Sequence, residues 1–146
     1  HAMLAMPFLE AGLPVFVDKP LTVNEGELRV FRSFLENGKL MSCGGMRYAV
    51  ELDEARRDFS IYGEVPLIRS SILNGWEKYG IHMIDAVLNL GSSKPVAVTA
   101  LRASHHSMAV HMDDGSLFQV DALGAMEKIF QLVIINYVLA HQLVII

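Results

Sequence analysis

Residues 1–20, HAMLAMPFLEAGLPVFVDKP, carry the clearest signal of the fold class. An apolar helical pattern over 2–11 stops at Gly12, which is the usual left-handed end of a helix. A short apolar strand over 14–17 follows and runs directly into the Asp-Lys-Pro triplet at 18–20, where proline cannot continue the strand. In open α/β sheets, ligands bind at the carboxyl ends of the strands. The stretch therefore predicts an α/β fold in which the lysine borders a ligand site.

Strand and helix patterns continue to alternate through residue 46. The strand over 14–17 is followed by an apolar stripe at three- and four-residue spacing, which predicts a helix over 23–36. Thr22 is expected to cap this helix, with Glu25 completing a capping box. Residues 40–46 are small and apolar and are expected to form the next strand. The alternation of strand, helix and strand predicts a parallel sheet.

The pattern changes after residue 46. A charged amphipathic helix is expected over 48–59, a strand over 66–73 and an apolar helix over 81–90. Three strand patterns then follow close together, and Asp114-Gly115 is a hairpin signal between the last two. These strands are expected at 96–103, 108–112 and 116–123. The sequence therefore predicts a second, α+β part with an open, largely antiparallel sheet.

The C-terminal run 129–146 has no formal charge and approaches the length of a membrane span. Polar residues interrupt it, and no aromatic or basic flank follows it. The interrupting residues are Gln131, Asn136, His141 and Gln142. We interpret residues 126–139 as a buried helix and the rest of the run as a second apolar segment. No association with a membrane is expected.

Composition narrows the class of protein. The chain has the length of one domain, and its 52% hydrophobic content exceeds the usual value of about 45–50%. Twelve basic and sixteen acidic residues give a net charge of −4 with no basic stripe, so nucleic acid is not an expected partner. The single cysteine, Cys43, excludes an internal disulfide and fits a reducing compartment. We therefore expect a cytoplasmic protein.

Two residues are candidates for catalysis. Lys19 at a strand end could hold a substrate oxygen and stabilise developing negative charge. His82 lies at the start of the expected apolar helix, and imidazole titrates near neutrality, which suits general acid–base chemistry. Asp85 follows one turn later and could orient the imidazole, while Glu77 and Lys78 could extend the polar cluster. The structural alternatives are a surface lysine and a core or capping histidine.

Other chemistries have weaker support. His105, His106 and His111 lie in or between expected strands, and their spacing matches no standard metal motif, so no metal is expected. The sequence holds no G-x-G-x-x-G or G-x-x-x-x-G-K-[ST] phosphate loop and no G-x-S-x-G nucleophile elbow.

Two motifs together resemble those of the glucose–fructose oxidoreductase / inositol dehydrogenase / MocA (Gfo/Idh/MocA) family of nicotinamide-dependent oxidoreductases. The first is similar to the family's A..AL.AGK helix followed by HVFVEKPLA. The second, residues 80–85 (GIHMID), is similar to its G-x-H-x-x-D helix start, and residues 46–48 (MRY) look like the strand end that opens its second domain. The first motif is matched by His1, Ala5, Leu9, Ala11, Gly12, 15–17, 18–20 and Leu21.

The resemblance implies hydride transfer between NAD or NADP and a secondary alcohol of a sugar, inositol or related polyol. It implies a Rossmann-domain remnant over 1–46 and a substrate-binding domain over 47–146, whose open sheet forms a homo-oligomer. Lys19 and His82 match the family's catalytic residues. The expected cofactor-binding residues are Asp18, Lys19, Pro20 and Arg47. The expected substrate-binding residues are Lys19, Lys78, His82 and Asp85.

The sequence departs from the family pattern in two important ways. Lys78 stands where many members carry an aspartate, and an ammonium there disfavours the protonated form of His82. The glycine-rich phosphate loop belongs to the first βαβ unit of a Rossmann domain, and the resemblance implies that on the order of a hundred residues of that domain would be absent from this sequence. We therefore expect the 146 residues alone to be inactive. A non-catalytic binding or assembly module of the same fold is the alternative.

Overall fold

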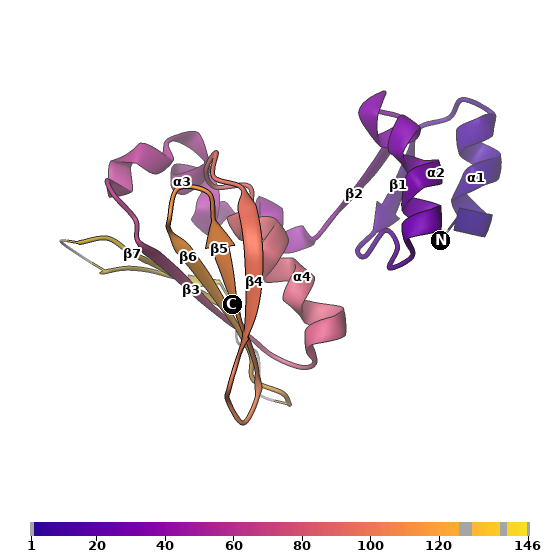
Figure 1. Ribbon diagram of the computed structural model, residues 1–146. Coiled ribbons are helices and arrows are strands. Elements are labelled where there is room, and N and C mark those ends of the chain that lie inside the picture. Colours follow the sequence, from indigo (N-terminus) through magenta and orange to yellow (C-terminus); the bar gives the residue numbers. More distant parts are fainter. Residues whose placement is uncertain (1, 126–129, 138–139, 146) are drawn as a thin grey trace. The chain divides into compact units, whose positions relative to one another are not determined.

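The computed structural model of the chain describes residues 2–125, 130–137 and 140–145 (Figure 1). The chain divides into two compact units, His1–Gly44 and Gly45–Ile146. Helices and strands alternate in the first unit, and a six-stranded sheet dominates the second.

The first unit is built around a parallel pair of strands. Its elements are α1 (Ala2–Glu10), β1 (Val15–Asp18), α2 (Glu25–Glu36) and β2 (Leu40–Cys43). The two strands pair in parallel, with Val15 opposite Leu40 and Asp18 opposite Cys43. The parallel βαβ arrangement predicted from the sequence is confirmed, and so is the helix end at Gly12, whose φ is 79°.

Both helices of this unit pack on one face of the strand pair. The small core is formed by Ala5, Leu9, Val17, Phe31 and Leu40. Phe31 is completely buried, whereas Phe16 and Met41 on the opposite face of the strands are about half exposed. Alternate side chains of a strand point to opposite faces, which is why neighbouring apolar residues of β1 differ so much in burial.

The cap of α2 differs from the prediction. Asn24, not Thr22, is the N-cap, and its Oδ1 accepts a hydrogen bond from the backbone N–H of Glu27 at 3.1 Å. The Thr22 hydroxyl instead donates to the Glu27 carboxylate at 2.6 Å and accepts from the Asn24 N–H at 3.0 Å. Asparagine caps helices at least as well as threonine. The capping pattern is therefore displaced by two residues, and α2 begins at Glu25.

The second unit contains one open sheet. Its strands are β3 (Leu67–Ile72), β4 (Pro95–Leu101), β5 (His106–Met112), β6 (Leu117–Ala122), β7 (Phe130–Ile135) and β8 (Ala140–Ile145). The strand order is β4-β5-β6-β3-β7-β8. Only the central pair β3–β6 is parallel, and the other neighbouring pairs are antiparallel. The largely antiparallel sheet and the hairpin at Asp114-Gly115 are confirmed.

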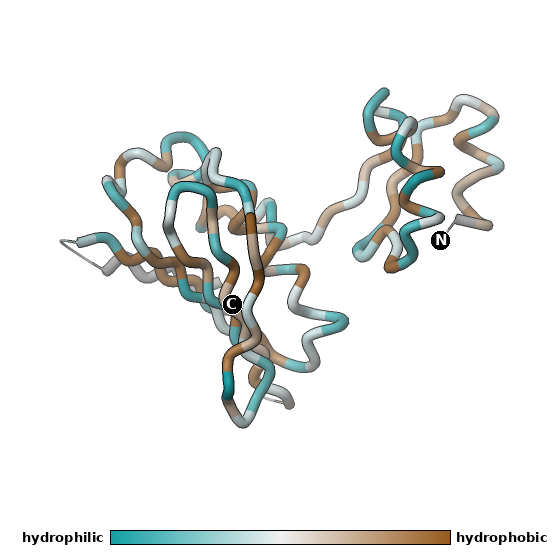
Figure 2. Tube along the Cα trace, in the orientation of Figure 1, coloured by the Kyte–Doolittle hydropathy of each residue, from teal (hydrophilic) through white to brown (hydrophobic). Residues whose placement is uncertain are grey.

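One helix, α4 (Trp76–Val87), covers one face of this sheet and contacts β3 and β6 (Figure 1). Hydrophobic and hydrophilic residues both occur along the strands of the sheet, as Figure 2 shows. The largest fully buried apolar side chains of this core are Leu52, Ile72, Met83, Phe118, Val120, Leu132 and Ile134. The strand register directs Arg69 and Asp121 to the opposite face, because residues adjacent along a strand alternate between faces.

The charged helix expected over 48–59 is wrong as a continuous element. The segment forms η1 (Gly45–Tyr48), η2 (Val50–Leu52), α3 (Asp53–Arg57) and η3 (Phe59–Tyr62). The backbone of Asp58 is extended, and its carboxylate accepts a hydrogen bond from the N–H of Ser60 at 3.0 Å. A short polar side chain that bonds the nearby backbone competes with helix continuation, which explains the break after α3.

The start of α4 was predicted too late. The helix begins at Trp76, directly after a turn in which Asn74 has a φ of 60°, and not at residue 81. Gly80, which is unfavourable in a helix interior, is buried under the Trp76 ring, and a Cβ atom there would lie 2.9 Å from Trp76 Cε3. His82 therefore lies in the second turn of the helix rather than at its entry.

The helix expected over 126–139 is also wrong, because residues 130–135 form β7. This strand pairs antiparallel with β3, and Leu132 and Ile134 are completely buried against α4's side of the sheet. Alternate burial in an Ile- and Val-rich segment is strand behaviour. Residues 126–129, 138–139 and 146 lie outside the described residues. Within the described part of the chain, no helix is long and apolar enough to cross a membrane.

Candidate functional site

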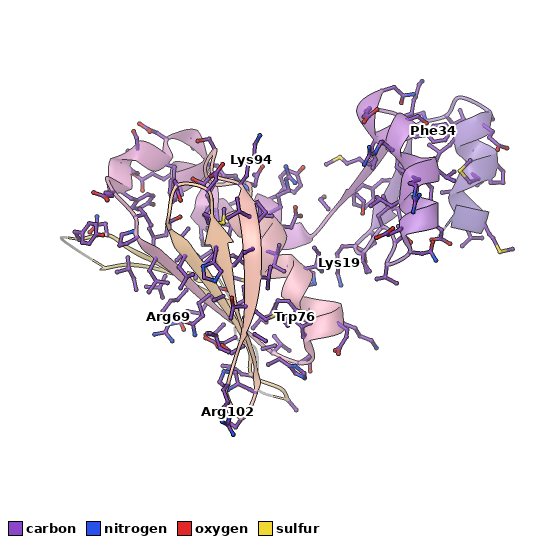
Figure 3. The ribbon with its side chains drawn as sticks, in the orientation of Figure 1. Lys19, Phe34, Arg69, Trp76, Lys94 and Arg102 are labelled. Carbon is purple, nitrogen blue, oxygen red and sulfur yellow. The ribbon has the colours of Figure 1, made fainter. Side chains whose placement is uncertain are left out.

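Lys19 immediately follows the last residue of β1. Asp18 is paired with Cys43 at the end of β2, and the Lys19–Pro20 peptide bond is cis. The carboxyl ends of the two parallel strands thus lie at the same edge, which is where α/β sheets bind ligands. The Lys19 side chain, labelled in Figure 3, is partly exposed, while Asp18 and Pro20 are exposed. The sequence prediction of a lysine at a strand's carboxyl end is confirmed as a matter of position.

His82 occupies the second turn of α4 in the second unit. Its ring lies 5.7 Å from the Tyr79 ring, measured between centroids, and the two planes are tilted by 47°. The side chain is partly exposed. Lys78 is exposed and lies four residues before His82, which places it on the same side of the helix.

Arg47 bridges η1 to α4 with two hydrogen bonds. Its Nη1 donates to Asp85 Oδ1 at 2.9 Å, and its Nη2 donates to Asn89 Oδ1 at 2.8 Å. Asp85 lies in the last turn of α4 and Asn89 in the turn that follows the helix, so the planar guanidinium reaches two acceptors four residues apart. The side chains are 36% exposed for Arg47 and 16% exposed for Asp85. This half-buried bridge fixes η1, which opens the second unit, on α4.

Two residues of the expected site are partners in this bridge. Asp85, which was expected to orient His82, is the ion-pair partner of Arg47. Arg47, which was expected to bind the cofactor, uses two of its N–H groups in the bridge, and the expected roles of both residues stay predictions. Asn89 was not predicted from the sequence, although its four-residue spacing from Asp85 is a usable signal for a shared partner.

A second polar cluster lies on the sheet face away from α4. The buried Asp121 carboxylate accepts hydrogen bonds from Ser107 Oγ at 2.5 Å and Gln119 Nε2 at 3.1 Å, and it lies 3.1 Å from His105 Nε2. Arg69 Nη2 lies 3.9 Å away. Burial alone would raise the pKa of Asp121, but the hydrogen bonds from Ser107, His105 and Gln119 outweigh it and lower that pKa below its ordinary value.

The structure assembles two groups of predicted site residues and assigns them to different units. Asp18, Lys19 and Pro20 belong to the first unit, and Arg47, Lys78, His82 and Asp85 belong to the second. Among the described residues, no group of three or more His, Cys, Asp or Glu side chains is arranged to hold a metal ion.

Comparisons with known proteins give matches among solved structures only. Neither a protein-family model nor a curated protein sequence matches the chain. Myo-inositol 2-dehydrogenase from Lactobacillus plantarum aligns with a TM-score of 0.81 and 17% identity, over 97% of this chain and 53% of that chain.

Two further structures agree with this match. Scyllo-inositol dehydrogenase from Lactobacillus casei, solved with bound NAD(H) and scyllo-inositol, aligns with a TM-score of 0.76 and 15% identity, over 97% of this chain and 53% of that one. UDP-N-acetylglucosamine 3-dehydrogenase GnnA from Acidithiobacillus ferrooxidans aligns with a TM-score of 0.71 and 16% identity, over 94% and 52% of the respective chains. The chain thus spans about half the length of the structures it matches.

Proposed function

We propose, from the Gfo/Idh/MocA oxidoreductase fold that this chain shares with those dehydrogenases, that the protein is an NAD(P)-dependent oxidoreductase. Its substrate would be a secondary alcohol of a sugar, inositol or related polyol. The observation that carries the proposal is the lysine at the carboxyl end of β1 in a parallel strand pair, within a chain whose second unit presents a partly exposed histidine on α4.

The residues present fit the nicotinamide end of a dinucleotide and not its phosphates. The edge formed by the ends of β1 and β2 is the position at which a parallel sheet meets a ligand. A pyrophosphate requires backbone N–H groups of a glycine-rich loop, and no G-x-G-x-x-G pattern occurs in the 146 residues. We propose Asp18, Lys19 and Pro20 as cofactor contacts. When bound, the nicotinamide supplies the hydride acceptor or donor.

The chain's own residues would handle the proton and the developing charge. In the oxidation direction, His82 takes the proton of the substrate hydroxyl, and the Lys19 ammonium stabilises the alkoxide oxygen. In the reduction direction, His82 returns that proton. Lys78 and Asp85 flank His82 along α4 and are the further proposed substrate contacts.

Arg47 is better suited to holding α4 than to holding a cofactor. Two of its N–H donors are already held by Asp85 and Asn89, each in a direct hydrogen bond at less than 3 Å. We therefore propose that Arg47 positions the helix that carries His82.

We further propose that the protein is a cytoplasmic homo-oligomer that associates through its open sheet. The sheet's edge strand β4 is exposed along its whole length, with Val96 64% and Val98 61% exposed. An edge strand has unpaired backbone groups on its outer side, and apolar side chains on such a strand favour association with another chain.

The test is an activity assay on the protein expressed from its complete reading frame. Reduction of NAD⁺ and of NADP⁺ is followed with myo-inositol, scyllo-inositol and UDP-N-acetylglucosamine as separate substrates. We expect turnover with at least one pair, and we expect Lys19→Ala and His82→Ala to abolish it. The matched controls Lys94→Ala and His111→Ala, both at exposed positions, should retain activity.

The second candidate function is a non-catalytic binding or assembly module. It is favoured by Lys78, whose positive charge lies one helical turn from His82. Cofactor binding without turnover on any of the substrates, together with normal folding, would support this candidate over the oxidoreductase.

A further inference from the structure

A cavity of about 480 Å³ lies within the second unit, apart from the candidate site. It is bounded by η3, the start of β3, the C-terminal end of α4 and the β5–β6 hairpin. Its size falls within the range of roughly 300–1,000 Å³ that is typical of small-molecule sites. Neither Arg47, Lys78, His82 nor Asp85 lines it.

The floor of the cavity is apolar. It is formed by Ile68, Val87, Leu90, Met112 and Phe118. These side chains belong to the buried core of the unit, so the floor is held by β3, α4, β5 and β6 together. Above this floor, the partly exposed side chains of Phe59, Val65 and Leu117 supply the apolar surface that a ligand could remove from water, at a gain of about 25 cal/mol per Å².

The rim of the cavity is polar and carries only negative charge. Glu64 and Asp114 contribute carboxylates, and no lysine, arginine or histidine occurs among the described residues that line the cavity. Asp114 accepts hydrogen bonds from the Ser116 hydroxyl at 2.6 Å and from the Ser93 hydroxyl. The bonds from Ser116 and Ser93 lower the pKa of Asp114, so its carboxylate is ionised at neutral pH.

We propose that this cavity binds a small organic cation, with an ammonium group beside Asp114 and Glu64 and an apolar body on the floor. An ammonium is attracted by both carboxylates, and water at the rim moderates that attraction because both side chains are exposed. A phosphate or carboxylate ligand is repelled by the same two groups. The site therefore differs in ligand chemistry from a dinucleotide site, and it does not depend on the proposed oxidoreductase function.

The test is a nuclear magnetic resonance titration of the uniformly ¹⁵N-labelled chain with three ligands of one shape. These are the phenethylammonium ion, the neutral 2-phenylethanol and the phenylacetate anion. We expect saturable shifts of amide signals at 63–65, 90–93 and 112–118 with phenethylammonium, weaker shifts with the alcohol and none with phenylacetate.

Three variants test whether phenethylammonium binding depends on the two carboxylates. Asp114→Asn and Glu64→Gln should each weaken phenethylammonium binding roughly twofold to fivefold, which is the range for exposed charge pairs. Asp113→Asn is the matched control, because Asp113 neighbours the hairpin but does not line the cavity, and it should leave binding unchanged. If Asp114→Asn does not fold, Glu64→Gln decides alone, since Glu64 is exposed.

Several outcomes would overturn the proposal. These are the absence of saturable shifts with phenethylammonium, equal binding of phenylacetate, shifts confined to residues away from the cavity, or unchanged affinity in the carboxylate variants that fold.

Discussion

Breaking the Arg47 bridge should destabilise the second unit selectively. Arg47→Met keeps much of the side chain's apolar length and removes both hydrogen bonds, to Asp85 and to Asn89. Exposed ion pairs contribute about 0.2–1 kcal/mol, and hydrogen bonds to a charged group contribute about 1.5–3 kcal/mol when buried. Arg47 is 36% exposed and Asp85 16% exposed, so the bridge lies between these limits.

We expect Arg47→Met to lower the free energy of unfolding by about 1.5 kcal/mol. The coupling between Arg47→Met and Asp85→Asn in a double-mutant cycle should be about 1 kcal/mol. For a unit of roughly 100 residues, each kcal/mol corresponds to a fall in the unfolding midpoint of about 4–8 °C.

The assay is urea unfolding followed by tryptophan fluorescence. Trp76 is the single tryptophan of the chain and lies in the first turn of α4 (Figure 3), so the signal reports on the helix that the bridge holds. Arg102→Met is the matched control, because Arg102 is an exposed arginine of the same unit. The reasoning is refuted if Arg47→Met and Arg102→Met have the same unfolding midpoint, or if the coupling with Asp85→Asn is zero within error.

Three further predictions concern individual contacts. Gly80→Ala should destabilise the second unit by about 1 kcal/mol in the same urea assay, because a Cβ atom 2.9 Å from Trp76 Cε3 outweighs the gain in helix propensity; a stabilised variant would contradict this. Asn24→Ala should cost about 1 kcal/mol and increase amide exchange in α2 more than Thr22→Ala does, and equal effects would restore Thr22 as the cap. Because the pKa of Asp121 is lowered in the folded state, its contribution to stability should be present above the unfolded pKa of about 3.9 and be lost as the pH falls through the lower folded pKa. Asp121→Asn should reduce the loss of stability on going from neutral to acidic pH, as measured by unfolding at several pH values. An unchanged dependence of stability on pH would contradict a stabilising role of the Asp121 carboxylate.

The first unit could be predicted because its signals are local. A helix ending in Gly12, an apolar strand and a capped helix each occupy a few consecutive residues, and the parallel pairing follows from their order. The cap itself was misplaced because two overlapping patterns, Thr22 with Glu25 and Asn24 with Glu27, both satisfy the same rule, and only the backbone geometry separates them.

The wrong predictions for the second unit concern features that long-range contacts decide. The uncharged run that contains β7 fits a buried helix or a buried strand equally well, and its pairing with β3, more than fifty residues earlier in the chain, decides for the strand. The same holds for the Asp121 cluster, since Ser107 and Asp121 meet only through the register of β5 and β6. The first turn of α4 is hard to predict because glycine is unfavourable in a helix interior. Only the structure shows that Trp76 packs on Gly80.

The two candidate catalytic residues were predicted on different grounds. The position of Lys19 at a strand end follows from local sequence, and the structure agrees. The pairing of Lys19 with His82 as one catalytic pair rests on the family resemblance, because the two residues belong to different units. Asp85 and Asn89 both accept a hydrogen bond from Arg47, and their four-residue spacing could have predicted a common partner.

The proposed function is hydride transfer from a polyol carbon to a nicotinamide with the help of Lys19 and His82. The most direct measurement uses inositols and sugar nucleotides deuterated at their secondary alcohol carbons, and mass spectrometry of the nicotinamide cofactor after incubation with the protein expressed from its complete reading frame. We predict that deuterium appears in the reduced cofactor with at least one substrate, and that Lys19→Ala and His82→Ala prevent it. Cofactor that binds to the folded protein but acquires no deuterium from any of these substrates would contradict the claim.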